Sequence, residues 1–255
     1  MIFNKSQIKN NFARAISSYD QNAILQKMVS SRLVDIAKND ILDARKIIDL
    51  GSGTGFIANK ILDKFPNKEI FQLDISEKML ANNAFKNAKI VADIEFLPFK
   101  KSSFDLAISS LSFQWLNDLE RTIPQILETL KNRQKLHFSI LGSSSLKELR
   151  GVIKDCKIEL SVNKFIDEKN LKSIINEYEY TLHKEDILLN YQDCHALLKS
   201  MKKIGANYSS INKSGKNNLN KNKLEVLNDF YLKNFNIKDN IYATWQVFYV
   251  SIKSL

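Results

Sequence analysis

The chain has 255 residues, of which 44% are hydrophobic and 26% charged, and its formal net charge is +10. This length and hydrophobic content predict a single α/β domain with one main core, rather than two equal domains. No run approaches the roughly 18 to 20 consecutive apolar residues of a membrane helix, and the N-terminal stretch MIFNKSQIKNNFARA lacks the apolar block of a signal peptide, so we expect a cytoplasmic protein.

Residues 4–39 have the spacing of two helices, and we expect them to form a helical cap over residues 1–40. In the second helix, apolar residues recur three and four positions apart, as they do on one face of an amphipathic helix. This face would consist of Ile24, Leu25, Met28, Val29, Leu33, Val34 and Ala37.

The period changes after the cap, where short runs rich in Ile, Leu, Phe and Val begin. These runs lie at 46–50, 69–74, 89–93, 104–109 and 135–141. Helical patterns separate them at 55–65, 76–86 and 117–131. Strands that alternate with helices in this way predict an α/β fold with a mostly parallel sheet and helices on both faces.

The remaining part of the chain, 143–255, begins with a helical pattern at SSSLKELR. Further helical patterns lie near 167–177 and 192–204. Two apolar runs at 178–190 and 241–252 would complete a seven-stranded sheet as an antiparallel edge pair. The low-complexity segment 205–223, GANYSSINKSGKNNLNKNK, is typical of a solvated flexible loop, with a lid or a partner contact as the alternative.

The positive charge comes mostly from lysines that are dispersed along the chain among many asparagines. An acidic protein would be attracted by this field as well as a nucleic acid would, so the charge predicts only an anionic partner. Cys156 and Cys194 lack the paired Cys or His spacing of a metal centre, and we expect no metal.

The segment IIDLGSGTG places Gly51, Gly53 and Gly55 at alternate positions between an apolar run and a helical pattern. A strand ending in Asp49, a glycine-rich turn and a helix beginning near Gly55 would direct backbone N–H groups at a ligand. A purely structural tight turn is the alternative. The pattern predicts a polar, partly anionic ligand at this turn.

Two further strand ends carry acidic residues. Asp74 follows the second strand, where a carboxylate can accept hydrogen bonds from both ribose hydroxyls. Asp93 and Ile94 follow the third strand and suit an adenine amino group and its ring face. Three successive strand ends therefore predict one adenosine-containing ligand, either a dinucleotide or a nucleoside sulfonium.

The alternating glycines preceded by Asp49 resemble motif I of the class I S-adenosylmethionine-dependent methyltransferases. The resemblance implies S-adenosylmethionine as the cofactor, bound within residues 41–142, with 143–255 on the substrate side. It implies that the first strand and its loop hold the methionine portion, that Asp74 holds the ribose, and that Asp93 and Ile94 hold the adenine. The cofactor-binding set is Asp49, Gly51, Ser52, Gly53, Gly55, Asp74, Ile75, Asp93, Ile94 and Ser109.

The fourth strand ends in SSLSFQW, without the Asn/Asp-Pro-Pro-aromatic cluster of enzymes that methylate amino groups of bases. Five blocks along the chain are similar to the malonyl-[acyl-carrier protein] O-methyltransferase family of biotin synthesis. These blocks are FARAISSYDQNAILQ (12–26), DIEFLPFKKSSFDLAISSLSFQWLNDL (93–119), LHFSILGSSSLKELR (136–150), LLKSMKKIGAN (197–207) and YATWQVFYV (242–250).

This resemblance implies methylation of the free carboxylate of malonyl-acyl-carrier protein, which gives the methyl ester that primes pimeloyl synthesis. The implied partner is an acidic acyl-carrier protein, and we expect a monomer that binds neither a membrane nor nucleic acid. A methyltransferase acting on a small carboxylic acid or a quinone, and a non-catalytic S-adenosylmethionine-binding protein, are the alternatives. The family's Lys-Pro-Gly-Gly turn is replaced by KNRQ (131–134), where we expect Asn132 to take the left-handed position.

A carboxylate is already ionised at neutral pH, since its reference pKa is about 4, so we expect no general base. His137 is expected to be structural, and the catalytic candidates are Tyr19, as a hydrogen-bond donor, and Arg150, as a planar fork for a carboxylate or phosphate. The predicted residues for substrate and carrier binding are Tyr19, Trp115, Lys131, Arg133, Lys147 and Arg150.

Overall fold

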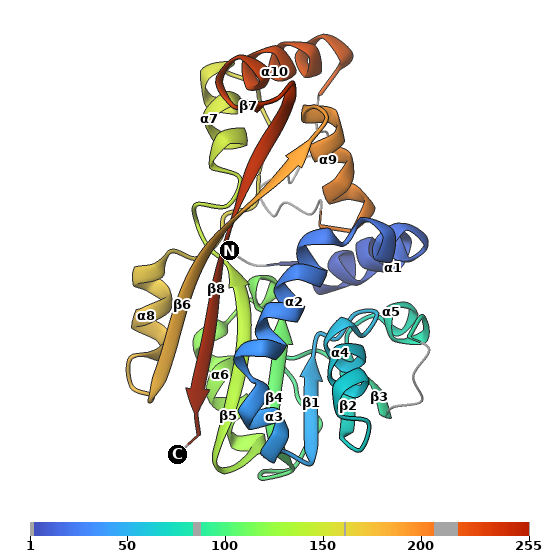
Figure 1. The fold of residues 1–255 in the computed structure, drawn as a ribbon, viewed down its shortest axis with the longest axis vertical. Helices are drawn as coiled ribbons and strands as arrows, with labels where there is room; N and C mark the ends of the chain where they lie inside the picture. Colours follow the sequence, from blue (N-terminus) through green and yellow to red (C-terminus); the bar gives the residue numbers. More distant parts are fainter. Residues whose placement is uncertain (1–2, 84–87, 161, 207–218, 255) are drawn as a thin grey trace.

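The computed structural model describes residues 3–83, 88–160, 162–206 and 219–254 (Figure 1). Its centre is an eight-stranded sheet whose main path has the order β3-β2-β1-β4-β5-β8-β6. Neighbouring strands from β3 to β5 pair in parallel, and β8 pairs antiparallel with both β5 and β6. The strands are β1 (Lys46–Leu50), β2 (Glu69–Asp74), β3 (Ala88–Val91), β4 (Phe104–Ser110), β5 (Leu130–Leu141), β6 (Tyr180–Tyr191), β7 (Asn236–Ile237) and β8 (Asn240–Lys253).

This topology confirms the expected α/β fold with a mostly parallel sheet and an antiparallel pair at one edge. The two-residue β7, which pairs with β8, was not expected. The connections from β1 to β2, from β2 to β3 and from β4 to β5 contain helices, whereas β3 and β4 are joined by a loop. The parallel strands all run in the same direction, so their carboxyl ends lie at the same edge of the sheet. The loops after β1, β2, β3 and β4 therefore meet at one edge, the carboxyl edge.

Ten α-helices lie in the described part of the chain, and α2 crosses one face of the sheet (Figure 1). The predicted cap contains three helices rather than two, because Ala23 and Ala37 interrupt the helical run. The helices are α1 (Lys5–Asn22), α2 (Ile24–Ile36), α3 (Lys38–Asp43), α4 (Phe56–Lys64), α5 (Glu77–Ala81), α6 (Leu119–Thr129), α7 (Lys147–Asp155), α8 (Glu168–Ile175), α9 (Cys194–Lys203) and α10 (Lys221–Asn234).

Two apolar clusters cover the two faces of the sheet. Successive side chains of a strand point to opposite faces, and so Ile47 of β1 joins the cluster under α2, α4, α7, α9 and α10, while Ile48 joins the cluster under α6 and α8. His137 on β5 is buried, as expected for a structural histidine. Its ring nitrogens lie 2.7 Å from Ser251 Oγ and 3.0 Å from Asp40 Oδ2.

The structure differs from the sequence-based expectation in two segments. In KNRQ, which forms a bulge within β5, the residue with positive φ is Arg133 (63°) and not Asn132. The last part of the expected loop 205–223 belongs to α10, while 207–218 lies outside the described residues. In the part of the chain that the structure describes, no helix is both long and apolar enough to cross a membrane.

Candidate functional site

A cavity of about 610 Å³ lies at the carboxyl edge of the sheet. Its floor is formed by the loops that follow β1, β2, β3 and β4, and its walls come from α1, α2 and α9 together with the segment between α7 and α8. Charged and polar groups line the end nearest the sheet, and apolar side chains dominate the end beneath α9. The cavity therefore has two halves of different chemistry.

The glycine-rich turn lies directly against β2. The backbone N–H groups of Gly51 and Ser52 both donate to the carbonyl of Leu73, at 2.7 and 3.0 Å. A Cβ on Gly51 would lie 2.3 Å from Ser112 Oγ, and a Cβ on Gly55 would lie 1.8 Å from Asn83 Nδ2. Both glycines also have positive φ, which side-chain-bearing residues adopt at a cost. Only glycine lets the turn approach its surroundings this closely.

Asp49 has an exceptional environment at the end of β1. Its side chain faces the cavity yet the residue is 1% exposed, and neither carboxylate oxygen has a hydrogen-bond partner among the described residues. Burial, and to a lesser degree the charge of Asp74, raises the pKa of Asp49 to about 8, although the nearby backbone N–H of Ala58, which is outside hydrogen-bonding geometry, acts in the opposite direction. A buried carboxylate without a donor is costly, so this residue is suited to a cationic or hydrogen-bond-donating ligand group.

Asp74 connects the second strand end to the glycine turn. One of its oxygens accepts the N–H of Gly53 at 2.9 Å, and the other accepts the N–H of Ser76 at 2.8 Å. Burial raises the pKa of Asp74 to about 6 although both hydrogen bonds favour the ionised form. Acceptor capacity remains on both oxygens, since each has a further lone pair. Asp74 can therefore receive two hydroxyl groups of a ligand.

Asp93 and Ile94 line the cavity after β3, at the far end of the polar half. Here α1 contributes a residue, Lys5, that no sequence pattern had singled out. Lys5 Nζ lies 3.3 Å from Asp93 Oδ1, pairs with Glu95, and donates to the carbonyl of Trp115 at 3.2 Å. The first turn of α1 is thereby attached to the wall of the cavity.

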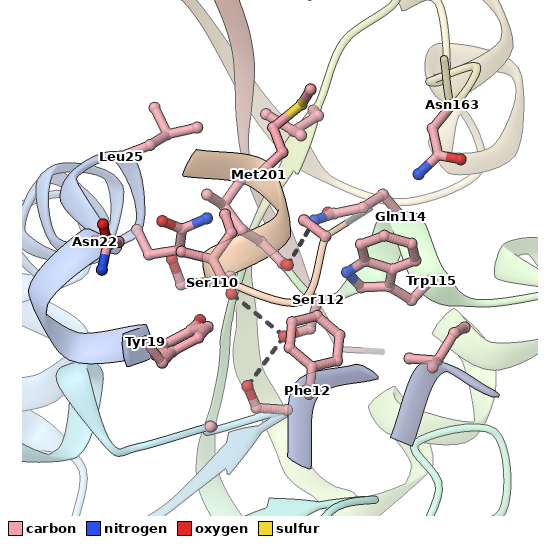
Figure 2. Close-up of a pocket in the computed structure, with 18 of the residues that line it drawn as sticks. Phe12, Tyr19, Asn22, Leu25, Ser110, Ser112, Gln114, Trp115, Asn163 and Met201 are labelled. Atoms are coloured by element: carbon pink, nitrogen blue, oxygen red, sulfur yellow. Dashed lines mark hydrogen bonds between the residues drawn. The ribbon is translucent and has the colours of Figure 1, made fainter. Parts of the chain in front are cut away.

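Figure 2 shows the second half of the cavity, where aromatic and amide side chains converge. The ring of Tyr19 stacks on Phe56 with centroids 6.0 Å apart, and burial raises the pKa of its hydroxyl above the ordinary range. Trp115 packs edge-on against Phe12 at 5.8 Å. Tyr19 and Trp115, the two candidates from this region, both line the cavity.

Two amides complete this half. Gln114 donates to the carbonyl of Leu111 at 2.6 Å, which leaves its buried Oε1 without a partner among the described residues. Asn163 is 8% exposed, and its Oδ1 likewise has no partner within the described ranges. Neither residue stood out in the sequence, because isolated amides carry no motif. They present unpaired acceptors to whatever the cavity holds.

Three predicted site residues, Ser109, Gly55 and Arg150, do not line the cavity but contact the segments that form it. Ser109 is fully buried, and its hydroxyl donates to the carbonyl of Leu50 at 2.7 Å, so the neighbouring Ser110 faces the cavity instead. Gly55 caps α4 below the turn. Arg150 does not point into the cavity: its guanidinium donates to the backbone carbonyl of Asn163 at 2.8 and 3.2 Å and thereby fixes a wall segment.

The remaining cationic candidates do not line the cavity. Lys131 pairs with Asp105 at 2.6 Å, and Asp105 also accepts the backbone N–H of Lys46 at the start of β1, so Lys131 lies at the opposite, amino edge of the sheet. Arg133 lies in the bulge that precedes the parallel pairing of β5 with β4. Lys147 is exposed at the start of α7. Lys131 and Arg133 lie away from the cavity because they precede the parallel part of β5, and residues before a parallel strand lie at the edge of the sheet opposite the ligand-binding loops.

The lining therefore favours a zwitterionic adenosine-containing ligand next to an apolar chamber. Its charged members within the described residues are Lys5, Asp49, Asp74, Asp93 and Lys202. The turn, the orphaned Asp49 and the acceptors at Asp74 and Asp93 fit a ligand with an ammonium group, a ribose and an adenine. The carboxylates of Asp74 and Asp93 would disfavour the phosphates of a dinucleotide in the same crevice.

A family described as "Methyltransferase domain" matches residues 48–138, which include the glycine turn and the first four strands. The chain is 32% identical to a malonyl-[acyl-carrier protein] O-methyltransferase of Ilyobacter polytropus, with 98% of both chains covered. It is 30% identical to a protein of the same name from Gallionella capsiferriformans, covering 80% of this chain and 76% of that protein.

Solved structures share the fold at low sequence identity. A SAM-dependent methyltransferase of Thermotoga maritima superimposes with a TM-score of 0.56 at 14% identity, covering 96% of this chain and 99% of the other. The plantazolicin methyltransferase BpumL in complex with S-adenosylhomocysteine gives a TM-score of 0.54 at 13% identity, with 98% of both chains covered. At these identities the likeness shows the fold alone.

Proposed function

The chain belongs to the malonyl-[acyl-carrier protein] O-methyltransferase family, and from this membership we propose that it methylates the free carboxylate of a malonyl thioester carried on acyl-carrier protein. S-Adenosylmethionine is the methyl donor. The product, a malonyl methyl ester, would serve as an apolar primer for the synthesis of a pimeloyl chain for biotin. The observation that carries the proposal is the continuity of one cavity, which runs from an acid-lined crevice into a chamber whose described lining contains no histidine.

The polar half would hold the cofactor. We assign the ammonium group of its methionine portion to Asp49 and the carboxylate to the glycine turn, Gly51 to Gly53, at the start of α4. Asp74 would accept the ribose hydroxyls, and Asp93 with Ile94 would receive the adenine. The support lies in the unpaired oxygens of Asp49 and in Gly51 and Gly55, where any side chain would collide with its surroundings.

Bound S-adenosylmethionine would supply an electrophilic methyl group for transfer to the carboxylate oxygen, with its thioether as the leaving group. A malonyl carboxylate is ionised at pH 7, since its reference pKa is about 4, so no proton has to be removed. The described lining offers no histidine, and the raised pKa of Tyr19 keeps its hydroxyl protonated as a donor.

Alignment and exclusion of water are then the contributions that the protein makes. Apolar side chains around the chamber, including Leu146, Met201 and Trp245, leave a carboxylate poorly solvated and therefore more nucleophilic. Holding the reacting atoms about 3 to 3.5 Å apart can lower a barrier by up to roughly 7 to 11 kcal/mol. Tyr19 would orient the acyl group by donating a hydrogen bond to it. The unpaired Oε1 of Gln114 and Oδ1 of Asn163 can only accept hydrogen bonds, so they would receive N–H groups of the thioester arm.

The test is mass analysis of malonyl-acyl-carrier protein after incubation with the protein and S-adenosylmethionine. We expect a gain of one methyl group, and release of methanol on alkaline hydrolysis will identify a methyl ester. Acetyl-acyl-carrier protein, which has no free carboxylate, is the matched control and should gain nothing. Methylation of malonyl-CoA, free carboxylic acids or quinones with no transfer to the carrier-bound substrate would instead support a small-molecule methyltransferase.

A further inference from the structure

The cavity reaches solvent between α2 and α9. Residues that both line the cavity and are exposed mark this opening, and they are Gln21, Ile24, Asn190 and Lys202. Gln21 and Ile24 lie at the junction of α1 and α2, and Lys202 lies in the last turn of α9. A hydrogen bond of 2.9 Å from Ser18 Oγ to the carbonyl of Lys203 holds the end of α9 against α1.

An exposed apolar pair lies on the α2 side of this opening. Ile24 is 58% exposed and Met28 is 46% exposed, and they are one helical turn apart. Lys27 lies between them in the sequence, with its ammonium 5.5 Å from the centre of the Phe56 ring. Neighbouring Leu25 and Val29 are buried, so the pair is not simply part of a loosely packed helix.

The α9 side of the opening is positively charged. Leu198, Met201 and Lys202 line the cavity, while Lys199 and Lys203 are exposed on the adjacent side of the same helix. No carboxylate within the described ranges pairs with any of these three lysines. The α9 helix itself, Cys194–Lys203, contains no acidic residue. An uncompensated positive edge next to exposed apolar surface suits an acidic protein partner.

We propose that Ile24, Lys27, Met28, Lys199, Lys202 and Lys203 form a docking surface, the carrier face, for an acidic carrier protein whose thioester arm enters the cavity between α2 and α9. This inference rests on the proposed function, and it moves the contact away from Lys131, Arg133 and Lys147. Exposed lysines accelerate the encounter with an acidic surface, and the apolar pair supplies an area that can be desolvated on contact.

The first test reverses charge at two positions that flank the opening without lining it. Lys199→Glu with Lys203→Glu should lower kcat/KM for malonyl-carrier protein by roughly tenfold or more and weaken its salt dependence. Turnover of malonyl-pantetheine, which carries the arm without the protein, should stay within about twofold, because the arm does not contact these lysines. The matched control is Lys147→Glu with Lys154→Glu on α7, which should leave kcat/KM for the carrier-bound substrate unchanged. It makes the same change in charge, and Lys154 lies in the last turn of α7 as Lys203 does in the last turn of α9.

The second test probes the apolar pair. Met28→Asp should weaken binding of fluorescently labelled malonyl-carrier protein, measured by anisotropy, by roughly fivefold or more. Leu42→Asp on α3 is the matched control, since Leu42 is 48% exposed against 46% for Met28, and it should leave binding unchanged. Thermal denaturation of every variant will separate lost binding from lost folding.

Each outcome decides the proposal. Equal losses in the α7 control, or a carrier-face variant that affects malonyl-pantetheine as strongly as the carrier-bound substrate, would overturn the carrier face while leaving the proposed function intact. Failure of the unmodified protein to bind malonyl-carrier protein in the anisotropy assay would overturn it too. Absence of methyl transfer to any carboxylate, with binding retained, would instead contradict the proposed function.

Discussion

Asp49 should make the affinity for S-adenosylhomocysteine depend on pH. In the free protein, burial and Asp74 raise the pKa of Asp49 to about 8, so the carboxyl group is mostly protonated at neutral pH. Pairing with the ammonium group of the ligand requires the ionised form. At about 1.4 kcal/mol for each pH unit below the pKa, ionising Asp49 costs about 2 kcal/mol at pH 6.5 and under about 1 kcal/mol at pH 7.5.

The direction in which the affinity changes with pH follows from the raised pKa of Asp49 in the free protein. Because the complex holds Asp49 ionised, binding releases a proton, and the dissociation constant should fall about eightfold from pH 6.5 to pH 7.5. This window lies above the pKa of about 6 of Asp74. Titration calorimetry in two buffers with different ionisation enthalpies measures both the affinity and the released proton.

Asp49→Asn is the matched variant, since it keeps the shape and removes the titration. Its affinity should be weaker at pH 7.5 and flat across the window, with no proton released. Urea unfolding of the variant will show that the loss is not a loss of the fold. An affinity of the unmodified protein that does not change between pH 6.5 and 7.5 would show that Asp49 does not ionise on binding. A variant that keeps the same pH dependence would show that another group titrates.

Two further predictions concern the fold around the site. Gly55→Ala should lower the free energy of unfolding by about 2 kcal/mol or more, because Gly55 has a φ of 89° and a Cβ there would collide with Asn83. At Gly151, inside α7, a Cβ would meet nothing within 4 Å, so Gly151→Ala should raise the free energy of unfolding by about 0.5 to 1 kcal/mol. Similar urea midpoints for the Gly55 and Gly151 variants would contradict both predictions. The hydrogen bond from His137 lowers the pKa of Asp40 to about 2. This hydrogen bond therefore stabilises the folded state fully above about pH 4, and the stabilisation is lost as the pH falls from there to about 2. Asp40→Asn should flatten that acid limb in urea titrations, and an unchanged limb would argue against the pair.

The central part of the fold could be predicted because the spacing of apolar residues changes sharply there, from the helical spacing of the cap to short apolar runs typical of strands. β1 and β2 have the predicted bounds, 46–50 and 69–74, since each is a short apolar run ended by an acidic residue and a turn. The glycine turn was predictable for a related reason, as three glycines in five residues are too costly to occur without a conformational demand.

Other features depend on tertiary contacts that no local pattern encodes. α10 was missed because its apolar residues follow a polar, lysine-rich stretch and only Leu227 and Tyr231 are buried. Lys5 lies far from Asp93 in the chain, and only the packing of α1 brings them together. The misplacement of Lys131 and Arg133 was avoidable, because residues that precede a parallel strand lie at the edge opposite the ligand loops.

The attachment of α1 at both ends has a kinetic consequence. This 18-residue helix, about 27 Å long at 1.5 Å per residue, is held at its start by Lys5 on Asp93 and near its end by Asp20, which accepts the hydroxyl of Thr54 at 2.7 Å. The donor crevice lies beneath this strap, whereas the acyl chamber opens elsewhere, past α9. Exchange of spent donor for fresh donor would thus require the strap to lift, and it would not have to wait for the acyl arm to leave through the other opening.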